Sequence, residues 1–213
     1  MSAEFGAWST LFLLGAYHGI NPGMGWLFAV ARGMQEHRTR AVAWSLPPIA
    51  LGHALSIGVV VLIVRFAQVA LPMTYIRTGV ATALMGLGVY KLIRSRHFRW
   101  GGMQVGFCEL TIWSFLMASA HGAGLMVLPV FLDMTARTHA ASCHTAPANT
   151  VGGPIAGLLA TLVHGAGYLV VTAVAASVVF EKFGLGFLRK AWFNLDLLWV
   201  IALVFTGVLT LLL

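Results

Sequence analysis

The sequence predicts an all-α membrane protein with six transmembrane helices. Of its 213 residues, 59% are hydrophobic and only 9% are charged, whereas about 25% of a typical soluble chain is charged. A helix needs about 20 apolar residues to cross a bilayer, so this length accommodates six spans with short connections. No separate aqueous domain fits, and we expect residues 1–213 to form a single integral membrane domain.

Apolar runs between charged residues give the six expected helices. They lie at about 8–31, 43–64, 76–93, 108–132, 152–180 and 191–213. The segment Met1–Trp8 contains Glu4 but no Lys or Arg, so it lacks the basic region of a cleavable signal peptide. We therefore expect the first run to remain as a span.

Lys and Arg residues predict the orientation, because those in short loops are retained on the cytoplasmic side. Ten of the 13 fall in the first, third and fifth connections: Arg32, Arg38, Arg40, Lys91, Arg94, Arg96, Arg99, Lys182, Arg189 and Lys190. The other three are Arg65, Arg77 and Arg137. This pattern predicts a multi-pass protein of the cytoplasmic membrane with both termini outside. It also explains the net charge of +7 without a nucleic-acid partner, since the basic residues separate apolar runs.

The two halves of the chain carry similar histidine motifs. His18 in the first run and His121 in the fourth are each followed by glycine. His53 in the second run and His164 in the fifth are each followed, six and seven residues later, by two valines. Because each half has three spans, the second half enters the membrane from the opposite side, which predicts a 3+3 inverted repeat. The two repeats cover about 8–95 and 108–213.

These four histidines are the candidate substrate-binding and metal-ligating residues: His18, His53, His121 and His164. An ionisable group within a span is costly unless it faces a partner or a wet cavity. Imidazole binds transition metals through a neutral nitrogen and takes up protons near physiological pH. The alternative is that each histidine only packs in the core, but four at matching depths favour a functional role.

Pro22 predicts a break in the first span, because proline has no N–H for the carbonyl four residues earlier. That carbonyl belongs to His18, and interrupted spans of transporters use freed backbone groups to bind ions. We expect Asn21 to coordinate the substrate or to bond the exposed backbone. The alternative is a proline kink with close helix packing, because small residues recur every four positions. These residues are Gly15, Gly19 and Gly23.

Three short motifs resemble the lysine-exporter (LysE) superfamily, which includes the NicO-type nickel/cobalt exporters. The motifs are Asn21-Pro22-Gly23, Ala31-Arg32-Gly33 and Ala50-Leu51-Gly52-His53. The resemblance is carried by the first two spans, and the six-span layout extends it over the chain. It implies secondary transport through a pathway lined by residues of both halves: His18, Asn21, Pro22, His53, His121 and His164.

We therefore predict a secondary transporter or exporter of a small cation, such as a transition metal ion, or of an amino-acid-like solute. The chain has no phosphate loop, dinucleotide fingerprint, G-x-S-x-G or H-E-x-x-H motif, so we expect neither an enzyme nor an ATP-driven pump. One alternative is a haem- or metal-binding subunit of a membrane redox complex, since histidines in spans can ligate haem. Another is a non-catalytic subunit. The expected partners are the lipid bilayer, the substrate, and either further copies of the chain or a membrane complex.

Overall fold

The computed structural model describes residues 2–93, 106–142, 154–183 and 188–212. Over these residues the chain is all-helical without β-strands, as the sequence predicts. The α-helices are α1 Ser2–Ile20, α2 Trp26–Glu36, α3 Thr39–Ala70, α4 Met73–Ile93, α5 Phe107–Ala120, α6 Ala123–Ser142, α7 Pro154–Val178 and α8 Leu188–Leu212. A 3₁₀ turn, η1 Pro22–Met24, follows α1, and a π-helical turn, η2 Val179–Phe183, follows α7.

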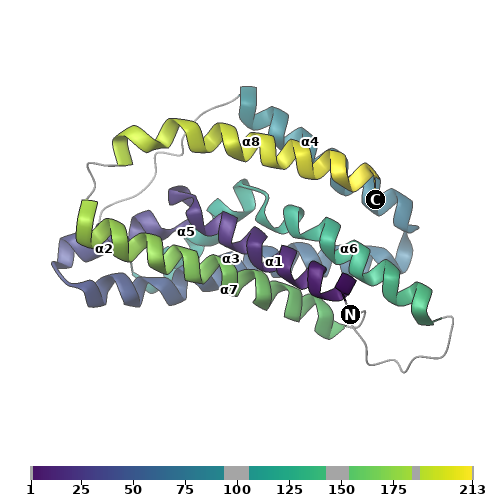
Figure 1. Ribbon diagram of the computed structural model, residues 1–213, viewed down its shortest axis with the longest axis horizontal. Helices are drawn as coiled ribbons and strands as arrows, with labels where there is room; N and C mark the ends of the chain where they lie inside the picture. The colour runs from purple at the N-terminus through teal and green to yellow at the C-terminus, as the bar shows by residue number, and fades with distance from the viewer. Residues whose placement is uncertain (1, 94–105, 143–153, 184–187, 213) are drawn as a thin grey trace.

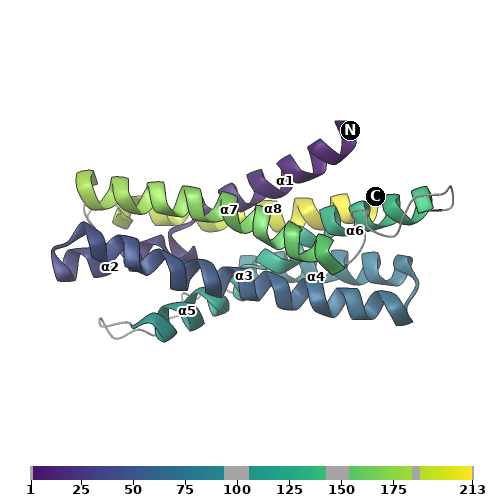
Figure 2. The same cartoon turned by 90° about the horizontal axis from the view of Figure 1, so that it is seen from below.

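The helices form an elongated bundle in which early and late segments of the chain pair with each other (Figure 1). Helix α1 packs along α7, α5 packs along α3, and α4 packs along α8, while α3 and α7 also contact each other. The start of α1 and the end of α8 lie at the same end of the molecule in both ribbon views (Figure 2). The core therefore forms where segments distant in sequence meet.

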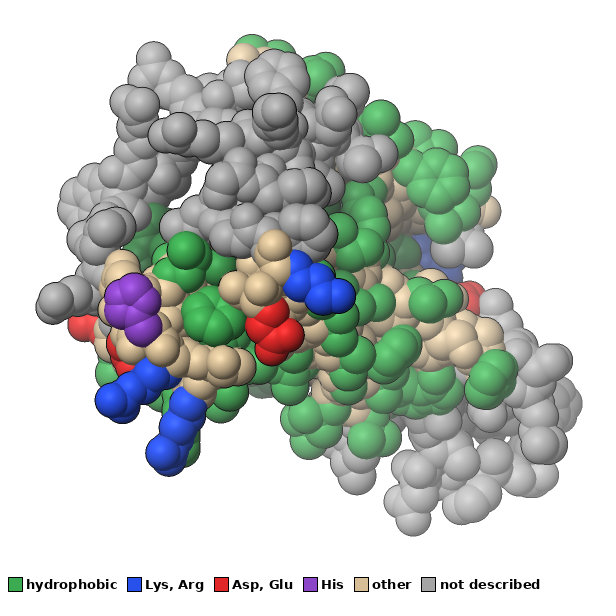
Figure 3. Space-filling view, turned by 60° about the vertical axis from the view of Figure 1, so that its left-hand side comes forward, with side chains coloured by type: hydrophobic (Ala, Val, Ile, Leu, Met, Phe, Trp, Pro, Cys, Tyr) green, Lys and Arg blue, Asp and Glu red, His purple; other side chains and the backbone are tan. Residues whose placement is uncertain are grey.

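Several helices are long and apolar enough to cross a membrane. Among the described residues these are 39–70, 73–93 and 156–182, and α5 with α6 gives a fourth candidate if the bent pair counts as one span. Large apolar side chains remain exposed along them, as at Leu62 and Leu158. Hydrophobic side chains cover much of the described surface in Figure 3, whereas the visible charged and histidine side chains gather mainly on one side. The chain is therefore embedded in a membrane.

The first predicted span is divided into two helices by a break over residues 21–25, which confirms the break expected at Pro22. Asn21 is extended, Pro22 opens η1, and Gly25 has a φ of 140°. A side chain is strained at that φ. A Cβ at Gly25 would also overlap with the Ile49 side chain of α3, so both backbone conformation and packing require glycine.

The fourth predicted span is also divided, although the sequence predicted a continuous helix there. Helix α5 ends at Ala120 and α6 begins at Ala123, and the two axes differ by 63°. Gly122 lies at the bend with a φ of 72°. A Cβ there would approach Leu87 of α4 and Leu203 of α8, so these helices fit closely around the bend.

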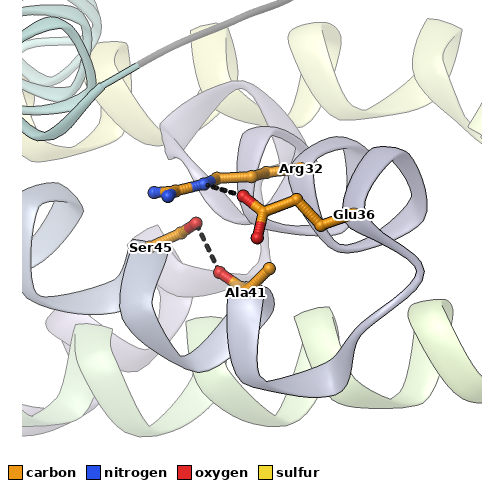
Figure 4. A network of polar contacts seen from close by, with 4 residues as sticks. All are labelled: Arg32, Glu36, Ala41 and Ser45. Atoms are coloured by element: carbon orange, nitrogen blue, oxygen red, sulfur yellow. Dashed lines mark hydrogen bonds and ion pairs between the residues drawn. The ribbon is translucent and has the colours of Figure 1, made fainter.

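The corner between α2 and α3 carries the first group of basic residues. Arg32 Nε donates to Glu36 Oε1 over 2.9 Å, and Ser45 Oγ donates to the Ala41 carbonyl over 2.8 Å (Figure 4). His37 ends α2 in the left-handed conformation, with a φ of 51°. The region expected to be a connecting loop is therefore a helical corner.

Close helix packing accompanies the break, so the two readings of the glycine-rich first span are compatible. A Cβ at Gly15 would overlap with the His164 carbonyl, and one at Gly19 would lie 2.7 Å from the Tyr168 carbonyl. Gly167 makes the reciprocal approach to α1. Small residues thus let the backbones of α1 and α7 approach, as at other membrane helix contacts.

Candidate functional site

Three histidines from three helices meet inside the bundle. His18 lies in the last turn of α1, His53 in α3 and His164 in α7, and each is 0% exposed. The ring centroid of His18 lies 4.9 Å from that of His164 and 5.7 Å from that of His53. We call these three residues the histidine cluster.

His53 and His164 face each other directly. Their Nε2 atoms are 3.4 Å apart and their ring planes differ by 7°. A neutral imidazole has one N–H and one lone pair, so one of these nitrogens must donate and the other accept. The Nδ1 atom of His53 is buried and has no hydrogen-bond partner among the described residues. The pair thus makes one hydrogen bond and leaves the Nδ1 of His53 unsatisfied.

His18 is oriented by its own helix. Its Nδ1 lies 2.6 Å from the Leu14 carbonyl. A carbonyl only accepts, so Nδ1 carries the hydrogen, and the lone pair of the neutral ring is on Nε2. This Nε2 is buried without a hydrogen-bond partner in the described part of the chain. His18 therefore presents an unused acceptor to the bundle interior.

His121 adopts the same local arrangement at the second break. It follows α5 directly, and its Nδ1 lies 2.8 Å from the Met117 carbonyl, four residues earlier. Its ring lies 5.6 Å from that of Trp199, which in turn lies 4.8 Å from His18. The structure thus brings three of the predicted histidines together and connects the fourth to them through Trp199.

Two aromatic residues that were not predicted from the sequence complete this site. Tyr168 stacks on His53 with ring centroids 3.8 Å apart, and its hydroxyl donates to the Met24 carbonyl over 2.5 Å. Trp199 Nε1 donates to the His121 carbonyl over 2.8 Å. Tyr168 follows His164 by four residues, so helical spacing could have identified it, because such residues share a face. No comparable sequence signal points to Trp199.

The residues of the first break bond to one another and to neighbouring backbone. Asn21 Oδ1 accepts the Gly23 N–H over 2.9 Å, while Asn21 Nδ2 is buried without a hydrogen-bond partner among the described residues. Pro22 is buried in η1. Asn21 therefore bonds the exposed backbone, one of the two roles expected for it.

The expectation that Pro22 frees the His18 carbonyl is wrong. Because the chain turns at the break, the Asn21 N–H reaches this carbonyl and donates to it over 3.3 Å. The Ile20 carbonyl is also satisfied, by the Trp26 indole N–H over 3.1 Å. Within the described residues, the polar groups without a partner near the break are therefore Asn21 Nδ2 and His18 Nε2, and not the His18 carbonyl.

The two breaks lie close to each other. A Cβ built on Gly23 would lie 3.4 Å from the Met117 methyl carbon and 4.0 Å from Cε1 of His121. The first break thus reaches the end of α5, while Tyr168 ties it to α7. Both breaks, the histidine cluster and the two aromatic residues form one continuous buried region, which we take as the candidate site.

Comparisons with known proteins assign no family. No family model, curated protein or solved structure matches this chain. The resemblance to the LysE superfamily therefore stays a prediction.

The histidines are not arranged as a metal site in this conformation. Among the described residues, no group of three or more His, Cys, Asp or Glu side chains could hold a metal ion. His53 and His164 use their Nε2 atoms on each other, and the Nδ1 of His18 is used by its own helix. The rings are therefore held by hydrogen bonds to each other and to the backbone, and metal binding would require them to turn their lone pairs toward a common point.

Proposed function

We propose that this protein is a secondary transporter that carries a small cation through the histidine cluster. The observation that carries the proposal is the burial of His18, His53 and His164 in mutual contact, with ring nitrogens that lack partners among the described residues. Buried polar groups without partners are costly, and in membrane helices they typically mark substrate and ion pathways. A structural core alone would not need these groups.

The proposal includes a six-span, 3+3 inverted repeat. In it, the broken span α1–α2 corresponds to the broken span α5–α6. Helix α3 corresponds to α7, and α4 corresponds to α8. Two observations support this correspondence. The broken segment of each half packs on the long helix of the other, α1 on α7 and α5 on α3. His18 and His121 also make the same bond to the carbonyl four residues earlier, each beside its break.

Alternating access follows from such a repeat, because one half can rock against the other around a site at their interface. Here the cluster combines His18 and His53 of the first half with His164 of the second. Rocking would let the His53 and His164 rings turn away from each other and open space for a cation. In this scheme both termini lie outside, which the excess of Lys and Arg in alternate connections favours.

A transition metal ion is the substrate class that the side chains favour. Neutral imidazole nitrogen is a good ligand for Zn²⁺, Cu²⁺, Ni²⁺ and Co²⁺, and a Zn–N bond is about 2.0–2.1 Å long. The two Nε2 atoms, 3.4 Å apart, already have the spacing of two ligands on one tetrahedral ion, so the rings need only turn their lone pairs toward it. His18 Nε2 is a suitable third ligand because its lone pair is unused.

Haem binding is a weaker alternative. A bis-histidine haem requires a flat macrocycle between two imidazole rings, whereas here His53 is stacked on Tyr168 at 3.8 Å and faces His164. These contacts leave no space for a macrocycle between the rings. A Soret absorption band in the purified protein would nevertheless favour the redox alternative over transport.

Transport can be tested with purified protein in proteoliposomes. We expect accumulation of at least one of Ni²⁺, Co²⁺, Zn²⁺ or Cu²⁺ above the level of protein-free vesicles, and its loss in His18→Ala. The matched control is His37→Asn, because His37 is exposed and asparagine tolerates its positive φ. Transport of an amino acid but no cation would overturn the substrate class. Equal activity of His18→Ala and wild-type protein would overturn the site.

A further inference from the structure

A hollow on the outer surface of the bundle lies between α3, α6 and α7. It has a volume of about 510 Å³, within the range of about 300–1,000 Å³ that is usual for ligand sites. Small residues of α3, Ala54 and Gly58, leave it open, and leucines such as Leu55, Leu62 and Leu158 line it. We call this hollow the apolar groove. Its lining suits a hydrocarbon chain.

A second cavity of about 400 Å³ lies at the corner between α3 and α4. Its lining includes Gln68, Phe66 and Met73, and Arg65 lines both this corner cavity and the apolar groove. Arg65 lies five residues before the end of α3. The two cavities together therefore provide an apolar groove along α3 and a cationic group, Arg65, near the end of that helix.

The polar groups at this junction are not fully used. Arg65 donates to Gln68 Oε1 over a long 3.4 Å, and within the described residues it makes no ion pair. The Nε2 atom of Gln68 is buried without a hydrogen-bond partner there. Neither cavity is lined by an acidic side chain. A guanidinium has five N–H donors, so both residues have donors available for an anion.

We propose that the apolar groove and the corner cavity bind one anionic phospholipid, with an acyl chain in the groove and the phosphate at Arg65 and Gln68. Arginine binds phosphate through two parallel hydrogen bonds, and the apolar groove beside Arg65 has room for an acyl chain. A neutral apolar ligand would leave the donors of Arg65 and Gln68 unsatisfied, and a free phosphate would leave the groove unused. This site is separate from the histidine cluster and does not depend on transport.

Lipid binding can be measured on the purified full-length protein by native mass spectrometry. Phosphatidylglycerol and phosphatidylcholine with identical acyl chains are titrated in detergent. We expect phosphatidylglycerol to bind about tenfold more tightly, which is the effect of one hydrogen bond to a charged group. Equal affinities in the wild-type protein would overturn the proposal without any variant.

Arg65→Gln should remove the preference for phosphatidylglycerol. The matched control is Arg77→Gln, because Arg77 lies near the start of α4, at the same corner, but lines neither cavity. We expect this control to keep the preference. An equal loss in both variants would overturn the site in favour of a general surface-charge effect.

Gly58→Leu tests the acyl chain. A Cβ at Gly58 has no atom within 4 Å, so leucine can be placed there without overlap and will project into the groove. We expect it to weaken phosphatidylglycerol binding about tenfold. Gly86→Leu is the control, since Gly86 of α4 is equally open but lies outside the groove. Unchanged binding in Gly58→Leu, or a dimer that excludes lipid from the groove, would overturn the proposal.

Discussion

The Nε2 atoms of His53 and His164 lie 3.4 Å apart where α3 meets α7, and both rings are fully buried. A proton between these nitrogens satisfies both. Removal of one ring would leave the Nε2 atom of the other ring buried without a partner. The effects of substituting the two residues should therefore not be additive.

We expect His53→Leu and His164→Leu each to lower cation transport about tenfold, because each removes one partner of the shared hydrogen bond and one candidate ligand. The double variant should lose less than the product of the two single losses, because residues at one site are not additive. Initial transport rates per folded molecule in proteoliposomes would measure this. Multiplicative losses would show that the two histidines act independently.

The first helix break should depend more on Gly25 than on Pro22. Gly25→Ala adds a side chain at a φ of 140° and against Ile49, and we expect it to cost about 1–3 kcal/mol of stability. Pro22→Ala should be mild, because the Asn21 cap and the Trp26 bond remain. Thermal unfolding in detergent would compare them. A larger loss in Pro22→Ala would show that proline alone maintains the break.

Close contact of α1 with α7 should make Gly15 intolerant of a side chain. Gly15→Ala places a methyl group against the His164 carbonyl, so we expect a loss of about 1–3 kcal/mol through overpacking together with reduced transport. Gly165→Ala is the control, because Gly165 neighbours His164 but its Cβ position is open. It should gain up to about 1 kcal/mol. Unfolding midpoints that fall equally in both would contradict this account.

Trp199 should stabilise the second break through one hydrogen bond. Trp199→Phe keeps an aromatic ring but removes the donor to the His121 carbonyl, and we expect a loss of about 1–2 kcal/mol in unfolding free energy. Trp44→Phe is the control, because Trp44 is 60% exposed. It should change stability little. If Trp199→Phe is as stable as wild-type protein, the hydrogen bond does not hold the break.

The sequence by itself determined the helical class, the membrane location and most helix positions. These follow from local properties, since apolar length sets a span and the missing N–H of Pro22 interrupts a helix wherever it folds. The expected runs at 43–64 and 76–93 accordingly fall within α3 and α4. The four histidines could also be selected, because ionisable groups are rare in apolar runs.

Only the tertiary structure decided how these residues meet. Leu87 of α4 and Leu203 of α8 pack closely around Gly122 at the second break. A local sequence pattern does not contain these contacts. The His18 carbonyl accepts a hydrogen bond from the Asn21 N–H because the chain turns at the break. The missing N–H of Pro22 therefore does not leave this carbonyl without a partner. Trp199 joins His18 to His121 from another helix. Contacts between rings depend on how whole helices pack, and sequence spacing within one helix does not contain that information.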